Sequence, residues 1–374
     1  MKTLKTFPVL FILLIFSTCL RAGEPGKWWD QPYPDRFDAS VLREQPAVVI
    51  DGKRFRTAGG EVFTFRGVSI GDPAKLAGQG RWDRRLFAEI RDWGANSIRL
   101  PVHPAPWRDL GADWYFSHID DAVRWANELG MYLVIDWHSI GNLDAELFQH
   151  PMYQTSLVET SRFWRSIAYR YRDVPTVALY ELFNEPTDNF IGVGSGSLGK
   201  ASWDEWRDTL EDLVDLVRVY DPSALPLVAG FNWAYDLSHV DDQPIRRERI
   251  AYAVHPYPMK SVPEEKTEAA QFALWEAWGH VAERYPVVAS ELGWVSEDGY
   301  GAHVPVIDNE GTYGPELVKF MEDRGISWMA WCFDPDWAPT MISDWDFTPT
   351  EQGRFFRHVM RRLREGDPVD AALP

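Results

Sequence analysis

The chain has 374 residues, a formal net charge of −18, 45% hydrophobic residues, 19 tryptophans and two cysteines. Its length allows one large domain or two smaller ones, and its apolar and aromatic content excludes global disorder. The acidic charge disfavours nucleic acid, an anionic membrane surface and acidic polymers as partners. We therefore expect a neutral partner, with a monomer as the default oligomeric state.

The N-terminal segment has the pattern of a secretory signal peptide. Lys2 and Lys5 precede an apolar run over residues 7–16, and small residues lead to a cleavage point after Ala22. The run is shorter than the ~20 residues of a membrane-spanning helix. Cys19 lies in a poor match to a lipoprotein signal, so we expect a secreted or periplasmic protein without a lipid anchor.

The remaining chain predicts one folded domain over residues 45–366, with an N-terminal extension over 23–44 and a tail over 367–374. Residues 47–70 alternate apolar and polar side chains and are broken by two glycine-containing turns, which predicts a short N-terminal β-hairpin. No linker rich in Ser, Thr or Pro interrupts the domain, so we expect no second module.

After this hairpin the sequence alternates helical patterns with short apolar strands. Gly94, Gly130 and Gly325 each stand where a helix ends and a strand begins. The predicted strands are Phe63–Ile70, Asn96–Val102, Tyr132–Asp136, Val177–Phe183, Leu227–Phe231, Ile250–Val254, Val287–Ser290 and Ile326–Trp331. The clearest later helices are predicted at 156–171, 203–219, 267–284 and 351–364.

This alternation predicts an α/β fold with a parallel sheet. Strands that are apolar on both faces and separated by helices favour a single (β/α)8 TIM barrel over an open sheet. The weakest unit follows Phe231, because the expected helix over 236–249 is polar and contains Pro244.

In such a barrel, chemistry belongs at the carboxyl ends of the strands. Polar residues gather at those positions in this sequence. They are Arg99, His103, Asp136, His138, Asn184, Glu185, Asn232, His255, Tyr257, Glu291 and Asp334.

Two carboxylates stand out among them, Glu185 after the fourth strand and Glu291 at the end of the seventh. Most glutamates are surface or ion-paired residues, and a single glutamate at a strand end would be interpreted in this way. Two at matching strand ends can instead flank one glycosidic bond, and a separation of ~5–5.5 Å supports double displacement through a covalent intermediate.

Asn184-Glu185-Pro186 after one strand, with Glu291 closing a later one, resembles family 5 glycoside hydrolases of the cellulase type. The resemblance extends over about residues 45–365. The positions that match the family's active-site pattern are Arg99, His138, Asn184, Glu185, His255, Tyr257, Glu291 and Trp331. The resemblance implies that Glu185 is the acid/base and Glu291 the nucleophile.

Each other matching residue has a physical role in such a site. We expect Arg99 to favour the ionised form of Glu291 and Tyr257 to donate a hydrogen bond to it. His255 can orient the acid/base group. The Asn184 amide can bond the sugar 2-hydroxyl, His138 can donate to another hydroxyl, and Trp331 can stack on the sugar ring.

Structural interpretations of these residues remain open. Arg99 can pair with Glu181 beneath the site, and the two histidines can be core residues with satisfied hydrogen bonds. A zinc site is the sharper alternative, but no closely spaced His/Glu motif occurs and the first strand contains no histidine. We therefore predict no metal and no other cofactor.

The tryptophans divide by position. Those with helical spacing are expected in the packing between barrel and helices: Trp93, Trp125, Trp164, Trp206 and Trp278. Those after strands are expected to supply several sugar-stacking rings: Trp107, Trp137, Trp233, Trp294, Trp337 and Trp345. Of these we predict that Trp233 binds substrate, in addition to Trp331. Two long loops, 293–315 and 333–349, are expected to shape the cleft.

These observations predict a secreted, retaining, endo-acting hydrolase of β-1,4-glucan, with a neutral β-linked polysaccharide or oligosaccharide as its substrate. The close alternative is another β-glycan, such as mannan or xyloglucan, because hydrolases of these substrates share the catalytic residues and the loops around the subsites determine which glycan is bound. A non-catalytic carbohydrate-binding barrel is a more distant alternative, because such a barrel would have lost one carboxylate.

Overall fold

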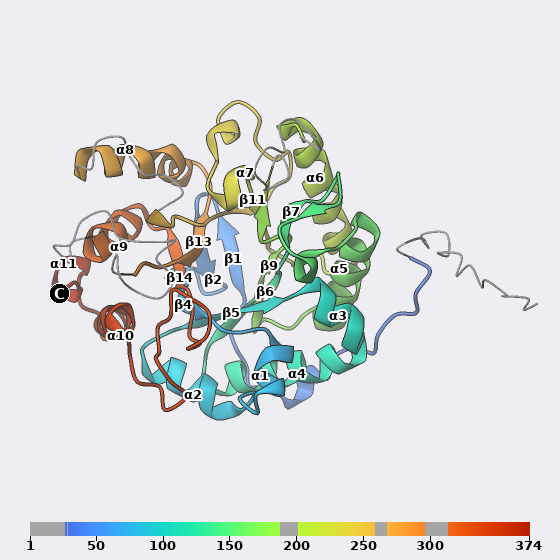
Figure 1. Ribbon diagram of the computed structural model, residues 1–374, viewed down its shortest axis with the longest axis horizontal. Coiled ribbons are helices and arrows are strands. Elements are labelled where there is room, and N and C mark those ends of the chain that lie inside the picture. The colour runs from blue at the N-terminus through green and yellow to red at the C-terminus, as the bar shows by residue number, and fades with distance from the viewer. Residues whose placement is uncertain (1–26, 28, 188–200, 259–267, 296–312) are drawn as a thin grey trace, which may run out of the picture.

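The computed structural model describes residues 27, 29–187, 201–258, 268–295 and 313–374. Its centre is a closed barrel of parallel strands in the order β4-β5-β6-β9-β11-β12-β13-β14, surrounded by helices (Figure 1). The strands are β4 (Arg66–Ser69), β5 (Ser97–Val102), β6 (Tyr132–Trp137), β9 (Val177–Glu181), β11 (Pro226–Ala229), β12 (Ala251–Val254), β13 (Val287–Leu292) and β14 (Ser327–Ala330). The predicted TIM barrel is confirmed.

Helices follow the strands around the outside of the barrel (Figure 1). They are α1 (Pro73–Gly78), α2 (Arg84–Asp92), α3 (Pro104–Leu110), α4 (Ala112–Glu128), α5 (Leu157–Tyr171), α6 (Trp203–Tyr220), α7 (Phe231–Ala234), α8 (Glu268–Gly279), α9 (Tyr313–Arg324), α10 (Glu351–Arg364) and α11 (Val369–Ala372). Short 3-10 turns are η1 (Ala39–Val41), η2 (Pro151–Tyr153), η3 (Ser238–Val240) and η5 (His280–Glu283). Within the described ranges, no helix is both long and apolar enough to cross a membrane.

The helix expected over 236–249 is wrong. The chain forms only the 3-10 turn η3 there, and the preceding Asn232, Trp233 and Ala234 have left-handed backbone conformations with φ of 55°, 55° and 60°. Left-handed residues cannot begin a right-handed helix, and Pro244 lacks the amide hydrogen that a helix interior needs.

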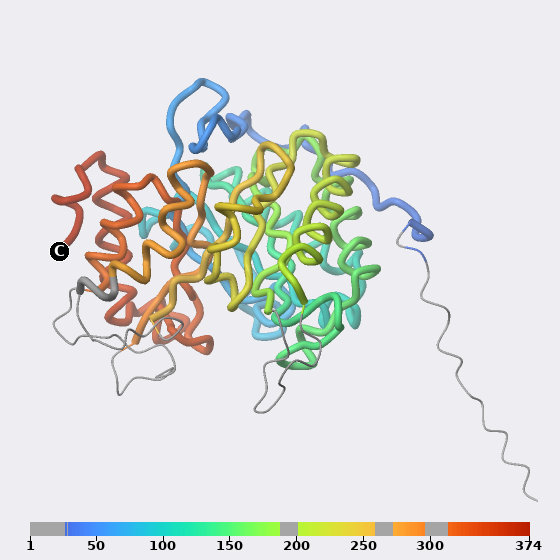
Figure 2. The backbone as a smooth tube through the Cα atoms, turned by 90° about the horizontal axis from the view of Figure 1, so that it is seen from above, coloured from blue at the N-terminus to red at the C-terminus, as the bar shows by residue number. Residues whose placement is uncertain are grey.

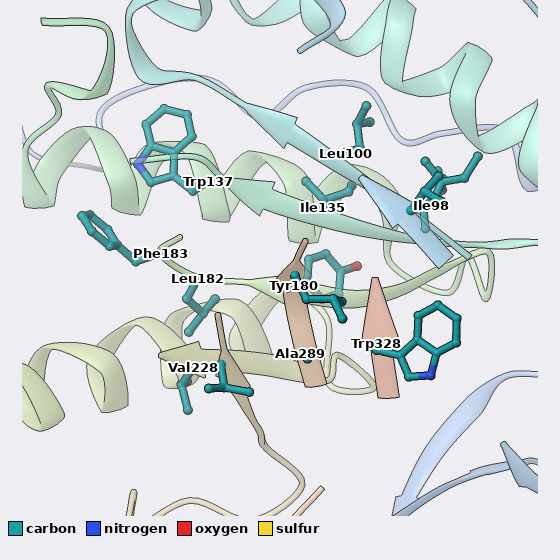
Figure 3. Close-up of a cluster of buried hydrophobic side chains, with 14 of the residues drawn as sticks. Ile98, Leu100, Ile135, Trp137, Tyr180, Leu182, Phe183, Val228, Ala289 and Trp328 are labelled. Atoms are coloured by element: carbon teal, nitrogen blue, oxygen red, sulfur yellow. The ribbon is translucent and has the colours of Figure 1, made fainter. Parts of the chain in front are cut away.

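The barrel strands carry two apolar faces. The outer face packs against the helices, and Figure 3 labels part of this cluster: Ile98, Leu100, Ile135, Trp137, Tyr180, Leu182, Phe183, Val228, Ala289 and Trp328. The inner face is a second cluster of mostly small residues that includes Val134, Ala253 and Met329. The alternation of strand side chains between lumen and helices produces this division.

A small antiparallel sheet closes one end of the lumen. It consists of β1 (Val48–Asp51), β2 (Arg54–Thr57) and β3 (Val62–Phe63), coloured blue in Figure 2. Phe55 of β2 packs edge-on against Phe65, and both belong to the lumen cluster. The strand predicted over 63–70 is therefore divided between this sheet and β4. Because the sheet fills the amino-terminal end, the opposite end is left for a site.

A second small sheet lies at that opposite end. Strand β10 (Glu185–Pro186) pairs in parallel with β7 (Ile140–Asn142), which pairs with β8 (Leu147–Phe148). The sequence did not predict this sheet, because its strands are only two or three residues long. It matters for function, because it fixes the backbone at Glu185.

Candidate active site

The predicted site residues converge at the carboxyl ends of the barrel strands. Arg99 lies on β5, Glu291 on β13, and the other residues lie in the segments that follow β6, β9, β11, β12 and β14. All of them except Trp233 are buried, as expected for a site whose charges act in a medium of low dielectric constant.

Arg99 is fully buried and has carboxylate or amide partners for every nitrogen of its guanidinium. Nε lies 2.6 Å from Glu181 Oε2, Nη1 lies 2.8 Å from Glu291 Oε1, and Nη2 lies 2.5 Å from Asn184 Oδ1. Nη2 is also 3.0 Å from Asp136 Oδ2. The two interpretations of Arg99 were not exclusive, because this side chain pairs with Glu181 and reaches Glu291.

These carboxylates determine the protonation of the arginine and of Glu181. Burial lowers the pKa of Arg99, but the charges of Asp136, Glu181 and Glu291 outweigh burial and raise it. Burial raises the pKa of Glu181, but Arg99 and His255 outweigh that effect and lower it to about 2. Glu181 is therefore a carboxylate beneath the site except in strong acid.

Glu291 is held by two donors. Arg99 donates to its Oε1, and the Tyr257 hydroxyl donates to its Oε2 over 2.8 Å. Burial, and then the Glu291 charge, raise the pKa of Tyr257, so the phenol stays protonated and can act only as a donor to Glu291. Each oxygen of Glu291 thus accepts from one fixed donor, so the carboxylate is held in one orientation, as a nucleophile requires.

Glu185 has a different environment. Its Oε1 lies 2.9 Å from His255 Nδ1, and its backbone N–H donates to the Ser139 carbonyl over 3.0 Å. Oxygen atoms of Glu185 and Glu291 and a nitrogen of His255 all lie within 4.8 Å of one another. The two carboxylates thus lie close together but have partners of different kinds.

Asn184 and His138 belong to the same cluster, because Arg99 Nη2 contacts Asn184 and also Asp136, the partner of His138. Asn184 Nδ2 is buried and has no hydrogen-bond partner among the described residues, so it can donate to a bound ligand. His138 Nδ1 lies 2.6 Å from Asp136 Oδ2. Burial and the nearby cations, His103 and Arg99 among them, lower the pKa of His138. Burial and the neighbouring carboxylates also raise the pKa of Asp136, so the hydrogen of this bond can lie on either partner, and the donor role expected of His138 toward a sugar hydroxyl stays a prediction.

Trp331 forms the flat wall of the site. Its ring is parallel to His138 within 4°, with centroids 5.5 Å apart, and parallel to Trp337 within 2°, with centroids 6.0 Å apart. Trp233 lies on α7, after strand β11. It is half-buried, and its Nε1 lies 3.3 Å from Gln149 Oε1. The structure therefore brings Trp331 to the site beside His138, and it places α7, which carries Trp233, in contact with β10, which carries Glu185. The substrate-binding role of Trp233 stays a prediction.

The grouping of tryptophans is partly wrong. The helical tryptophans do belong to the outer core. Trp107, Trp137 and Trp294 also pack there, Trp137 being stacked on Phe163 with centroids 4.2 Å apart, so they do not line the cleft. Trp137 is the last residue of β6 and points to the helices, Trp107 lies on helix α3, and Trp294 follows β13 by two residues, so a place near a strand end does not by itself turn a ring toward the site. Much of the loop over 293–315 lies outside the described residues.

Sequence reasoning missed two contributors. Ser290 bonds both His255 and Glu181, and no short motif marks it. Lys75 on α1 lies 2.5 Å from Asp334 and 5.1 Å from the centroid of the Trp337 ring. A strand-end aspartate is visible in the sequence, but its partner on a distant helix is not.

A parallel barrel with two carboxylates close together at its strand ends, one held by an arginine and a tyrosine and the other by a histidine, is the architecture of a barrel glycoside hydrolase. The family model described as Cellulase (glycosyl hydrolase family 5) matches residues 56–336. The chain belongs to this family, and the resemblance stated from the sequence is confirmed.

Individual relatives agree with this assignment. The chain is 54% identical to the β-glucanase SdGluc5_26A from Saccharophagus degradans, with a TM-score of 0.85 over 91% of this chain and 100% of that one. It is 26% identical over 82% of its length to endoglucanase A from Butyrivibrio fibrisolvens, of which it spans 65%. It spans 47% of endoglucanase N from Pectobacterium atrosepticum. The catalytic domain of the Thermobifida fusca endoglucanase Cel5A shares the fold. It is 20% identical to this chain, with a TM-score of 0.64 over 84% of this chain and 97% of that domain.

Proposed function

We propose that the protein is a retaining β-1,4-glucanase in which Glu185 is the acid/base and Glu291 the nucleophile. The separation of the two carboxylates carries the proposal, because their oxygens lie within 4.8 Å. Retaining enzymes hold the pair ~5–5.5 Å apart, whereas inverting enzymes need ~6.5–9.5 Å to admit a water molecule between carboxylate and sugar.

In the first step, the Glu291 carboxylate attacks the anomeric carbon while Glu185 gives its proton to the glycosidic oxygen. The bond from the anomeric carbon to that oxygen breaks, the leaving sugar departs as an alcohol, and a glycosyl ester forms on Glu291. Arg99 and Tyr257 hold Glu291 in position, and the Asn184 amide can bond the 2-hydroxyl as charge develops on the sugar.

In the second step, Glu185 is a carboxylate and accepts a proton from water. The resulting hydroxide character lets the water oxygen attack the anomeric carbon, and the ester bond to Glu291 breaks. The product keeps the configuration of the substrate, and both glutamates return to their starting states.

A neutral β-linked glucan is the substrate class that the chain favours. The net charge of −18 disfavours anionic polymers, and Trp331 offers an aromatic face to an uncharged sugar. The relative from Saccharophagus degradans, 53% identical in that structure, was crystallised with cellotetraose. We therefore propose a cello-oligosaccharide or longer β-1,4-glucan, cleaved internally. Predominant release of products from mannan or xyloglucan in a substrate panel would overturn this choice.

The roles of the glutamates are tested with Glu185→Ala. This variant should lose hydrolysis of a natural glucan but keep the first step on an aryl glycoside with a good leaving group, because that group needs no proton. Azide should then restore turnover, since it attacks the glycosyl ester without a base. Equal loss on both substrates, without rescue by azide, would assign Glu185 a structural role and make Glu181 the next candidate.

We also propose export after cleavage of residues 1–22, which lie outside the described residues. The charged and apolar pattern of that segment supports this. Mass measurement of the mature N-terminus after expression in a secreting host should locate the cut after Ala22. A retained Met1, or a lipid on Cys19, would contradict it.

A further inference from the structure

A chain of hydrogen bonds passes through a serine beneath the acid/base residue. Ser290 is fully buried on β13 next to Glu291. Its Oγ lies 2.7 Å from Glu181 Oε1 and 3.0 Å from His255 Nε2. The pairing register of β13 shifts between Ala289 and Leu292, and this irregularity lets both Ser290 and Glu291 reach the site.

The available hydrogens determine the direction of each bond. Glu181 is a carboxylate, because Arg99 Nε lies 2.6 Å from its Oε2, so its oxygens can only accept. The Ser290 hydroxyl has one hydrogen, which it gives to Glu181. Toward His255 the same oxygen must therefore accept, and His255 Nε2 must bear a hydrogen.

This assignment constrains the other ring nitrogen of His255. Nδ1 lies 2.9 Å from Glu185 Oε1. With Nε2 protonated, one further proton lies between these two atoms, either on Glu185 as a carboxylic acid or on Nδ1 of an imidazolium. We propose that Ser290 is a positioning residue that fixes the Nε2–H form of His255 and so keeps the acid/base proton on the Glu185–His255 pair. This inference rests on the proposed role of Glu185.

The charges around His255 fit a shared proton. Glu185, Glu181 and Glu291 face the ring, with Glu291 Oε2 3.8 Å from Nδ1. Arg99 pairs with two of these glutamates, and His138 lies close enough to interact electrostatically with His255. Burial lowers the pKa of His255, but these carboxylates outweigh burial and raise it. When the proton leaves for the glycosidic oxygen, a carboxylate remains beside a neutral ring. The proton of the attacking water restores the pair.

Without the serine hydroxyl, the deprotonated pair gains an alternative. The ring of a Ser290→Ala variant can place its single hydrogen on Nδ1 and donate to the ionised Glu185, a bond that the Nε2–H form cannot make. Loss of the acid proton then becomes easier. The basic limb of the pH profile of kcat/KM should move to lower pH by about 1 unit, because one additional hydrogen bond to the ionised form of Glu185 lowers the pKa of the pair by roughly that much.

Two matched variants separate this effect from a structural one. Ser290→Thr keeps the hydroxyl and should keep the native profile. Ser69→Ala removes another buried serine hydroxyl of the barrel, one whose Oγ has no hydrogen-bond partner among the described residues, and should also leave the profile unchanged. A Ser290→Ala profile that superimposes on that of the native protein would overturn the proposal, as would a shift of the same size in Ser69→Ala.

A direct measurement does not depend on activity. In protein labelled with 15N-histidine, the His255 nitrogen shifts should show Nε2 protonated throughout the range in which the protein is folded. In Ser290→Ala they should show Nδ1 protonated at high pH. A native neutral ring with its hydrogen on Nδ1 would overturn the proposal. Failure of the proposed function is distinguishable, because it would abolish the expected response to Glu185→Ala and leave these shifts unaffected.

Discussion

Arg99 is the residue on which the charge balance of the site depends. It is fully buried and contacts Glu181, Glu291, Asp136 and Asn184, so it compensates carboxylates that would otherwise be buried together. Removing one partner of a buried ion pair costs about 3–5 kcal/mol, because the other charge is left uncompensated. A substitution of Arg99 should therefore lower stability and activity together, so the two effects cannot be separated. Substitutions of its neighbours test the catalytic roles more cleanly.

Tyr257 provides such a probe. Tyr257→Phe removes the 2.8 Å hydrogen bond to Glu291 Oε2 and leaves the ring in place. Hydrogen bonds to charged groups contribute about 1.5–3 kcal/mol, so kcat should fall about 10- to 100-fold while the melting temperature changes little. A loss of less than about 2-fold in steady-state kinetics would mean that the hydroxyl does not support the nucleophile.

Protonation of Glu181 should govern stability in acid. Its pKa is lowered to about 2 in the folded protein from an ordinary value of 4.5, so its contribution is complete above pH 4.5 and is lost as the pH falls toward 2. The raised pKa of His255 acts in the opposite direction: its contribution is complete below about pH 6.5 and is lost as the pH rises through the folded value.

The lowered pKa of His138 adds a contribution that is complete above about pH 6.5 and is lost as the pH falls below it. These three groups together predict a melting temperature that is highest near pH 6.5, declines on both sides, and loses the Glu181 contribution below about pH 4.5. Scanning calorimetry across pH measures this, and Glu181→Gln should flatten the acid side. An unchanged acid slope in that variant would show that other carboxylates dominate.

At the scale of elements, the short sheet β10-β7-β8 fixes Glu185 through its backbone. Gly141 has φ of 154°, and a Cβ there would lie 2.3 Å from the Leu147 carbonyl oxygen. The Thr187 N–H donates to the Gly141 carbonyl over 2.9 Å, so any displacement is transmitted to the strand that carries Glu185.

Gly141→Ala should consequently reduce kcat at least about 10-fold, since small displacements of a catalytic group are costly. Gly78→Ala is the matched control, because a Cβ at Gly78 meets no atom within 4 Å. Equal activity of the two variants would show that β7 does not position the acid.

Strand β14 separates packing from binding. Trp328 is fully buried against the helices and donates to Glu322 over 2.8 Å, whereas Trp331 lies in the site. Trp328→Ala should lower the unfolding free energy by about 3–5 kcal/mol. Trp331→Ala should lower turnover with a smaller change in melting temperature. Thermal unfolding and kinetics on both variants test this, and the reverse pattern would contradict it.

The expected parity on this strand holds only as far as the strand. Strict alternation from Trp328 predicts that Trp328 points to the helices and that Trp331 and Phe333 share the opposite face. Trp328 does point outward, but Phe333 packs against Trp93 in the outer cluster rather than beside Trp331. The regular strand ends at Ala330, and alternation cannot be extended beyond it. Short or irregular elements escaped the sequence interpretation for the same reason: periodicity needs several residues to be read.

At the scale of the whole molecule, the barrel follows from the repeated alternation of apolar strands and helices, and the site follows from the strand-end rule. The small sheet over the amino-terminal end was predicted as a hairpin, but its role as a cover for the lumen was not, because that contact joins Phe55 to residues far along the chain. Pairings such as Lys75 with Asp334, or Ser290 with Glu181, depend on closure of the barrel and have no local signal.

The most direct test of the central claim is to identify the carboxylate that bonds the sugar. A 2-deoxy-2-fluoro cellobioside with a good leaving group should form a glycosyl ester that hydrolyses slowly, because fluorine destabilises the positively charged transition state. Peptide mass mapping should find the added disaccharide on Glu291 of the native protein and no adduct in Glu291→Gln. An adduct on Glu185 or Glu181, or normal glucan turnover by Glu291→Gln, would contradict double displacement through Glu291.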